Sequence, residues 1–296
     1  MTQESRTVSL VLGSGGARGL AHIGIIRYLE EQGYRIESIS GSSMGALIGG
    51  IYATGKLEVY AEWVSALEKI DILRLLDISF SSGGFLRGDK VIRALRDLIG
   101  DHRIEDLPIA YTAVAADLNR QREVWLKSGS LFDAIRASIA IPTLFTPVKH
   151  ENRLLVDGGL VNPVPIAPTI RDDTDLAIAV DASAAEEKGI EHSHRNRPEK
   201  DSSYRQQIMD FLDNMNLLPK IESREEKAMD TMEILTNSIE VMQSMITRFQ
   251  LAANTPDILI KIPQNIATFY EFDHAEELIA FGYERARDTF ANRQPD

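Results

Sequence analysis

The sequence of 296 residues contains no cysteine and no apolar run long enough to cross a bilayer. Without cysteine the chain has no disulfide, no zinc–thiolate or iron–sulfur site and no cysteine nucleophile. A membrane-spanning helix needs about 18 consecutive apolar residues, and no stretch approaches that length. Residues 1–6 also lack the apolar segment of a secretory signal. We therefore expect a cytoplasmic protein that touches membranes only peripherally.

Basic residues are too few to balance the acidic ones. The chain has 44 Asp and Glu residues against 32 Lys and Arg residues, so its formal net charge is −12. Such a field repels phosphate, which argues against nucleic acid as a partner and against steering onto anionic membranes. Hydrophobic residues make up 44% of the chain, which is enough for a sizeable core. Nothing in the composition calls for a cofactor or a metal.

Strand and helix patterns alternate along the chain, which is typical of an α/β protein with a parallel sheet. Glycine clusters or aspartates end several of the apolar strand patterns, and Ser130 is a candidate helix N-cap. Strands are predicted at 8–12, 36–40, 109–116, 124–126, 176–180 and 258–262, with a hairpin at 148–149 and 153–156. Helices are predicted at 20–32, 46–54, 57–76, 89–98, 130–138 and 274–290.

Two polar segments interrupt this alternation, a Ser/Gly-rich loop at 79–84 and a longer loop at 184–203. Two helices are predicted after the longer loop. The second has apolar residues spaced by three and four positions, a rhythm typical of a helix that packs against other helices. These residues are Met232, Leu235, Ile239, Met242, Ile246 and Phe249.

The pentapeptide Gly41-Ser42-Ser43-Met44-Gly45 fits the pattern G-x-S-x-G between a predicted strand and a predicted helix. In such an elbow the central serine, here Ser43, is pushed out of the sheet, and the residues two positions before and after it must be small for the turn to close. A helix N-terminus at this point favours negative charge. The pattern indicates a serine nucleophile; the alternative is a purely structural glycine turn.

A second glycine cluster, Gly13-Ser14-Gly15-Gly16-Ala17-Arg18-Gly19, follows the first predicted strand. It lacks the G-K-[ST] ending of a P-loop, and Arg18 stands where a dinucleotide fingerprint needs glycine. Consecutive glycines also let several N–H groups point at one anion. Beside an elbow serine, that anion would be the oxyanion of an acyl-transfer intermediate. A tight turn without a ligand is the alternative.

A serine nucleophile needs a base. None of the histidines follows a strand pattern as a triad histidine does; they are His22, His102, His150, His192, His194 and His274. Three aspartates close apolar strands, Asp117, Asp157 and Asp181, and would lie at the active-site edge of a parallel sheet. Asp157 is favoured because Gly158 and Gly159 allow close backbone approach. The other two stay open, with strand-end capping as the structural alternative.

Together the glycine loop, the elbow and Asp157-Gly158-Gly159 resemble the three signatures of the patatin-like phospholipases. Segments 104–108 and 133–142 are similar to bacterial members, and the likeness covers about residues 8–182. It implies a three-layer α/β/α sandwich with a mostly parallel central sheet. It implies Ser43 as nucleophile, Asp157 as base and an oxyanion hole from Gly15 and Gly16. The remaining motif residues that it implies are Gly13, Arg18, Gly19, Gly41, Gly45, Gly158 and Gly159.

The resemblance implies hydrolysis of phospholipid, lysophospholipid or other acyl esters through an acyl-enzyme. One departure is Ser14, where the family often has glycine. Because the proposed oxyanion donors are main-chain N–H groups, this difference in side chain weakens the resemblance little. We expect a catalytic domain at 8–182 and a helical extension with one strand at 183–296, within one globular unit. A homodimer is compatible with the sequence.

Two other functions remain open. An acyltransferase would use Ser43 with a histidine, for which His150 is the only candidate. A non-catalytic membrane-surface adaptor would place Met232, Met242 and Met245 against lipid, although packing of that helix on the core or on a second subunit is the favoured interpretation.

Overall fold

The computed structural model describes residues 6–75, 88–142, 144–190 and 231–292. These residues form one eight-stranded sheet with the order β5-β6-β3-β2-β1-β7-β8, and β4 also pairs with β3. The strands are β1 (Thr7–Leu12), β2 (Arg35–Ser42), β3 (Ala110–Asp117), β4 (Arg122–Leu126), β5 (Val148–His150), β6 (Arg153–Asp157), β7 (Leu176–Ala184) and β8 (Ile258–Pro263). The five strands from β3 to β8 through β1 are parallel, whereas β4, β5 and β6 run in antiparallel pairs. The predicted mostly parallel α/β sheet is confirmed.

Helices follow the strands in the order that the alternation predicted. They are α1 (Ala21–Glu31), α2 (Met44–Ala53), α3 (Leu57–Ser65), α4 (Lys69–Leu75), α5 (Asp89–Ile99), α6 (Leu131–Ser138), α8 (Thr231–Ala253) and α9 (Ala275–Ala291). Short 3-10 turns lie at η1 (Gly16–Leu20), η2 (Ile104–Asp106), η3 (Gly158–Leu160), η4 (Ala167–Thr169), η5 (Gln264–Ile266) and η6 (Phe272–His274). Ser130 is the predicted N-cap of α6, since its Oγ accepts the Asp133 N–H.

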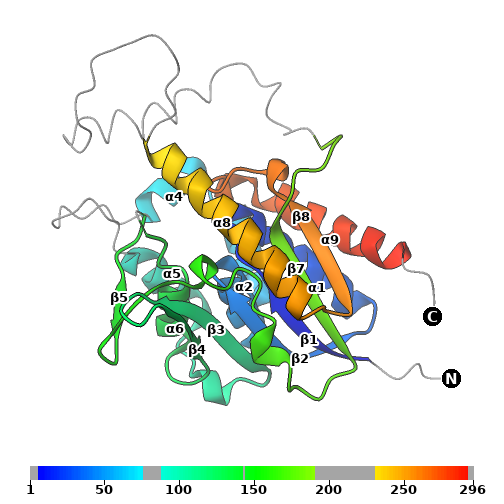
Figure 1. Cartoon of the computed structure of the whole chain (residues 1–296), viewed down its shortest axis with the longest axis horizontal. Helices are drawn as coiled ribbons and strands as arrows, with labels where there is room; N and C mark the ends of the chain where they lie inside the picture. Colours follow the sequence, from blue (N-terminus) through cyan, green and yellow to red (C-terminus); the bar gives the residue numbers. More distant parts are fainter. Residues whose placement is uncertain (1–5, 76–87, 143, 191–230, 293–296) are drawn as a thin grey trace, which may run out of the picture.

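Alternating side chains of β1 show how the sheet is covered on both faces. Val8, Leu10 and Leu12 enter a large core that includes residues of α1, α2 and α9. Val11 points the other way, into a small cluster against which Leu251 of α8 packs. Figure 1 shows α8 crossing in front of the sheet with no described helix or strand in front of it. The sandwich is therefore asymmetric, with a thick apolar layer on one side and a thin one beneath α8.

The described residues after 182 belong to the same sheet and the same helix packing as the residues before it. Strand β8 pairs with β7, and α9 lies along α1. Gly24 and Gly282 permit this approach, because a Cβ at either position would overlap the backbone of the facing helix. The C-terminal elements thus complete the same sheet and the same core.

Some predicted elements need correction. The helix predicted at 57–76 is two helices, because the Asp71 carboxylate accepts the Glu68 N–H at 3.3 Å and starts α4 anew. Strand β7 continues past Asp181 to Ala184, so Asp181 does not close it. The loop at 79–84, most of the 184–203 loop and the first helix predicted after it lie outside the described residues.

Packing of the apolar face of α8 on the core is not found among the described residues, whereas packing on a second subunit stays a prediction. Leu235, Met242 and Phe249 are exposed, and Ile239 and Ile246 are only half-buried. The side chain of Met232 lies outside the described residues. Spacing predicted correctly that these residues share one side of a helix, but not which side of α8 faces the protein.

Candidate active site

Ser43 is the single residue between the end of β2 and the start of α2. Its backbone has φ 54° and ψ −120°, a conformation that costs a non-glycine residue free energy and is typical of a nucleophile elbow. The two flanking glycines are required sterically. A Cβ at Gly45 would overlap the Leu12 carbonyl, and one at Gly41 would overlap the backbone of Gly45. The chain can therefore turn here only because glycines stand two positions before and two positions after Ser43.

The hydroxyl of Ser43 donates a hydrogen bond to Oδ2 of Asp157 at 2.6 Å. The other carboxylate oxygen, Oδ1, accepts the Gly159 N–H at 2.7 Å. Both side chains are almost completely buried, each with 3% of its surface exposed. Burial raises the pKa of Asp157 from 3.8 to about 7, although the hydrogen bonds from Ser43 and Gly159 oppose the shift. The pair thus joins a hydroxyl to a carboxyl group whose basicity is unusually high.

Asp157 lies close to Ser43 although its strand is not one of the parallel strands of the sheet. Its strand, β6, runs antiparallel to β3 and pairs with it at residues 115–117, so that Asp157 lies opposite Ala115. One strand further, Val114 pairs with Ser42 of β2. The expectation that Asp157 ends a parallel strand is therefore wrong, because its hairpin folds back over the end of β3. The expected edge of the sheet is nevertheless correct.

The C-terminal end of α6 and the residues just after it support both partners, a role that sequence reasoning missed. The hydroxyl of Ser138 accepts the Ser43 N–H at 3.0 Å and donates to the Val114 carbonyl at 2.6 Å. The Ala140 carbonyl accepts the Asp157 N–H at 3.0 Å. Ser138 is fully buried. One turn of chain therefore fixes the backbones of the serine and the aspartate relative to each other.

The glycine loop presents two N–H groups that have no acceptor in the described part of the chain, those of Gly15 and Gly16. Their neighbours are bound: the N–H groups of Gly13, Ser14 and Ala17 donate to the carbonyls of Val180, Pro163 and Phe269. Gly16 has φ +55°, and a Cβ there would lie 2.6 Å from Phe269. The loop is thus held on both sides while its centre keeps two donors available, as an anion site requires.

Two buried residues hold this loop in place. His22 bonds through Nε2 to the Gly13 carbonyl at 2.9 Å, and because a carbonyl only accepts, Nε2 carries the proton. Burial lowers the pKa of His22 to about 4, so the ring is neutral near pH 7. Arg18 donates to the carbonyls of Ala182, Gln264 and Ala267 and pairs with Glu240 of α8 at 2.9 Å. Its guanidinium is therefore committed to tying the loop to β7, η5 and α8.

The other candidate bases lie in different surroundings. Asp117 accepts the N–H groups of Asn119 and Arg120, and Asp181 accepts that of Ser183, so each caps its own turn. His150 pairs with Arg153 at the end of the β5–β6 hairpin. Among the described residues no histidine hydrogen-bonds to Ser43 or Asp157. His192 and His194 lie outside these residues.

The glycines after Asp157 allow close packing against the rest of the site. A Cβ at Gly158 would overlap the Val114 carbonyl, and one at Gly159 would lie 2.8 Å from both Ser14 Oγ and the side-chain amide nitrogen of Gln243. Gln243 belongs to α8, which therefore borders the site directly. Ser14, the departure from the family pattern, is buried against Gly159 and its hydroxyl has no partner among the described residues.

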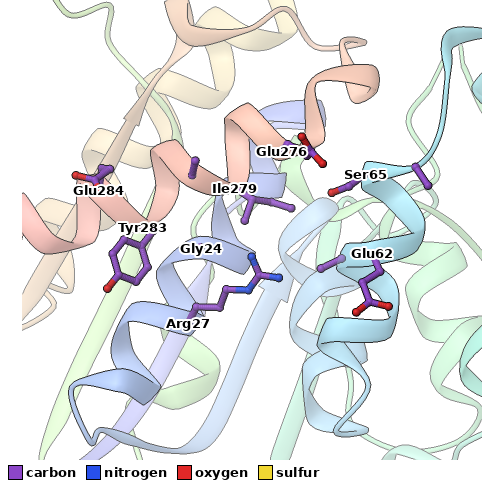
Figure 2. Close-up of a pocket in the computed structure, with 11 residues that line it drawn as sticks. Gly24, Arg27, Glu62, Ser65, Glu276, Ile279, Tyr283 and Glu284 are labelled. Atoms are coloured by element: carbon purple, nitrogen blue, oxygen red, sulfur yellow. The ribbon is translucent and has the colours of Figure 1, made fainter.

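A groove of about 670 Å³ lies elsewhere, between α1, α3 and α9. Figure 2 shows Arg27 among the carboxylates of Glu62, Glu276 and Glu284. Arg27 is itself paired with Glu58. This groove contains none of the predicted site residues, and its acidic rim is unsuited to a phosphate ester. Across the described ranges, no group of three or more His, Asp or Glu side chains could hold a metal ion.

A family model, sequence relatives and a solved structure are similar to this chain. The sequence model of the family described as patatin-like phospholipase matches residues 10–170. An uncharacterized NTE family protein of Mycobacterium bovis is 39% identical over 322 aligned residues, covering 94% of this chain and 89% of the relative. A lysophospholipase of Emericella nidulans is 30% identical over 190 residues, covering 62% of this chain and 12% of that longer protein. Among solved structures, VipD from Legionella pneumophila matches with a TM-score of 0.44 at 14% identity, covering 98% of this chain and 67% of that chain.

The fold and the family match define a carboxylic ester hydrolase with a mixed α/β sheet. The chain belongs to the patatin-like phospholipase family, and the resemblance inferred from its motifs is confirmed. Within the described residues, no helix is both long and apolar enough to span a bilayer.

Proposed function

We propose that this protein hydrolyses acyl esters of phospholipids or lysophospholipids through a dyad of Ser43 and Asp157. The observation that carries the proposal is the 2.6 Å hydrogen bond from the Ser43 hydroxyl to a buried carboxylate. In the first step, Asp157 takes the hydroxyl proton as Oγ attacks the ester carbonyl carbon. The proton then passes to the departing alcohol oxygen, and the acyl group stays on Ser43.

The N–H groups of Gly15 and Gly16 are the proposed donors to the oxyanion that forms during the attack. Neither N–H group has an acceptor among the described residues, which supports this role, because donors in an oxyanion hole must be free to bind developing charge. Water then enters, Asp157 takes a proton from it, and the resulting hydroxide cleaves the acyl-enzyme to release the fatty acid. Ser43 regains its proton from Asp157.

The raised pKa of Asp157 supports its use as a base. An aspartate with its ordinary pKa is too weak a base to accept a serine proton efficiently, whereas a pKa near the working pH favours transfer. The two hydrogen bonds on Asp157 also fix which oxygen faces Ser43.

Residues 8–182 are the proposed catalytic domain, with 183–296 completing the same globular unit. Pairing of β8 with β7 and the packing of α9 on α1 support a single unit, because the later residues share the sheet and the core with the earlier ones. The acyltransferase alternative has no such support, since His150 makes no hydrogen bond to Ser43 or Asp157 among the described residues.

A hydrolysis panel tests the proposal. Wild-type protein is assayed on a lysophospholipid, a diacyl phospholipid and a short-chain nitrophenyl ester, beside Ser43→Ala, Asp157→Asn and His150→Ala. We expect activity to disappear in the first two variants and to persist in the third, and a fluorophosphonate probe to label wild type but not Ser43→Ala. Activity that survives Ser43→Ala would refute the assignment, and loss in His150→Ala would favour the histidine-dependent transferase.

A further inference from the structure

Helix α8 is amphipathic in the opposite sense to a helix on the surface of a water-soluble protein. Its side toward the protein carries polar residues, among them Glu240, Gln243, Thr247 and Gln250. Six large apolar side chains on the other side are exposed, from 45% for Leu235 and Met245 to 71% for Phe249. The set consists of Ile234, Leu235, Val241, Met242, Met245 and Phe249, and we call it the outer face of α8. Half of the exposed large hydrophobic residues in the described part of the chain belong to it.

The polar side of α8 is attached to the candidate active site. Gln243 borders Gly159, whose N–H binds Asp157. Gln250 donates to the Val161 carbonyl just after η3, and Glu240 pairs with Arg18 of the glycine loop. The outer face is therefore held in a fixed relation to the dyad, on the helix that crosses in front of the sheet in Figure 1.

The outer face has almost no capacity for hydrogen bonding. Its one exposed serine, Ser238, already donates its hydroxyl to the Ile234 carbonyl at 2.7 Å. A protein–protein interface usually forms about ten hydrogen bonds between its two sides. A hydrocarbon phase needs none, so the chemistry of this face suits lipid better than a protein partner.

The distribution of charge on α8 also favours a lipid surface. Although the chain carries 44 acidic residues, positions 234–253 include only one, Glu240, which is turned inward and paired with Arg18. The only other charged residue in this stretch is Arg248, which is exposed. A 100° rotation per residue places Arg248 and Asn237 along one edge of the outer face, where a long basic side chain can reach lipid phosphates. The helix thus avoids the repulsion that the net charge of −12 would cause at an anionic surface.

We propose that the outer face of α8 docks on a phospholipid bilayer and holds the Ser43–Asp157 dyad at the lipid surface. The helix would lie in the plane of the interface, with its apolar side chains inserted about 5–10 Å below the headgroups, as amphipathic interfacial helices do. This inference rests on the proposed function, because a lipid esterase must meet its substrate at such a surface. It adds the surface through which the substrate is reached.

Binding is tested without turnover, using the full chain with Ser43→Ala and vesicles of phosphatidylcholine with or without phosphatidylglycerol. Co-sedimentation should be reduced at least tenfold by Met242→Glu with Met245→Glu. Two matched controls should bind as the parent does: Met242→Leu with Met245→Leu, which keeps the face apolar, and Val59→Glu, which adds a carboxylate on an exposed apolar position of α3. Absence of vesicle binding by the parent, or equal binding by the glutamate variant, would overturn the proposal.

Activity separates docking from chemistry in the Ser43-containing protein. The Met242→Glu, Met245→Glu variant should hydrolyse the soluble nitrophenyl ester at the wild-type rate and lose at least tenfold of its rate on vesicles. Sedimentation velocity of the same variant checks the alternative occupant: a wild-type dimer that the two glutamates dissociate would assign the outer face to a second copy and overturn the lipid proposal. If wild type hydrolyses no ester while Ser43→Ala still binds vesicles, the proposed function fails and docking stands.

Discussion

Replacing Asp157 by asparagine should make the protein more stable above neutral pH, even as it removes the proposed base. The carboxyl group is 3% exposed, and its only hydrogen-bond donors among the described residues are the Ser43 hydroxyl and the Gly159 N–H. An asparagine can keep both contacts, because its oxygen accepts from Gly159 while its amide donates to the serine oxygen. The substitution therefore removes the ionisation with little change in shape.

The magnitude follows from the pKa of Asp157, which burial raises from 3.8 to about 7. Below about pH 4, both the folded and the unfolded chain hold the proton, so ionisation costs nothing. Between these pKa values the unfolded chain releases the proton and the folded chain does not, so the free energy of unfolding falls as pH rises. Above about pH 7 the loss is complete and amounts to about 4 kcal/mol, at about 1.4 kcal/mol for each tenfold change. Asparagine avoids this loss.

Urea unfolding of wild type and Asp157→Asn at a series of pH values measures the difference. The variant's advantage should grow from near zero at about pH 4 to roughly 4 kcal/mol at about pH 8. Asp106→Asn is the control, because that carboxylate is exposed and makes no hydrogen bond through its side chain among the described residues. A difference between wild type and Asp157→Asn that does not change with pH would refute the argument that burial raises this pKa.

Two further predictions concern residues that position the site. Ser138→Ala should lower kcat on the nitrophenyl ester about fivefold with little change in KM, because one hydrogen bond that fixes the Ser43 backbone is worth about 1 kcal/mol. Ser138→Thr should restore part of the lost kcat, and an unchanged kcat in Ser138→Ala would remove Ser138 from this role. His22→Gln should reduce the acid lability of the fold, because the unfolded chain takes up a proton near pH 6.5 that the buried ring resists until about pH 4. On acidification across that range, the free energy of unfolding of His22→Gln should therefore rise by about 3 kcal/mol relative to that of wild type, measured by urea unfolding at matched pH.

Local pattern was sufficient to predict the elements that build the site. Strand–turn–helix order and the glycines near Ser43 are local features, because this elbow can close only where positions 41 and 45 lack a side chain. The glycine loop could also be predicted locally, because a run of glycines indicates a place where backbone segments approach closely. Short apolar runs likewise identified the strands, because parallel strands that are buried on both faces are hydrophobic along their whole length.

Contacts between distant segments could not be predicted from the sequence. Nothing near Ser138 indicates that its hydroxyl binds the Ser43 amide, 95 residues away. The antiparallel course of β6 was missed as well, because strand direction is decided by which edge of β3 is available and not by the residues of β6 itself. For α8, periodicity shows that apolar residues share a side of the helix, but tertiary packing decides whether that side meets protein or surroundings.

The cost of burying Asp157 and its proposed role have the same physical origin. In water an aspartate holds its proton too weakly to take one from a serine hydroxyl. Enclosed by β3, β6 and the segment after α6, the carboxylate has lost water and gained two hydrogen bonds from the described residues, so its ionised form is high in free energy. That free energy is recovered when the carboxylate accepts the Ser43 proton, which is the step the proposed mechanism needs. Additional hydrogen-bond donors on Asp157 would stabilise the folded protein and at the same time weaken the base, so a site that works without histidine is expected to be short of them.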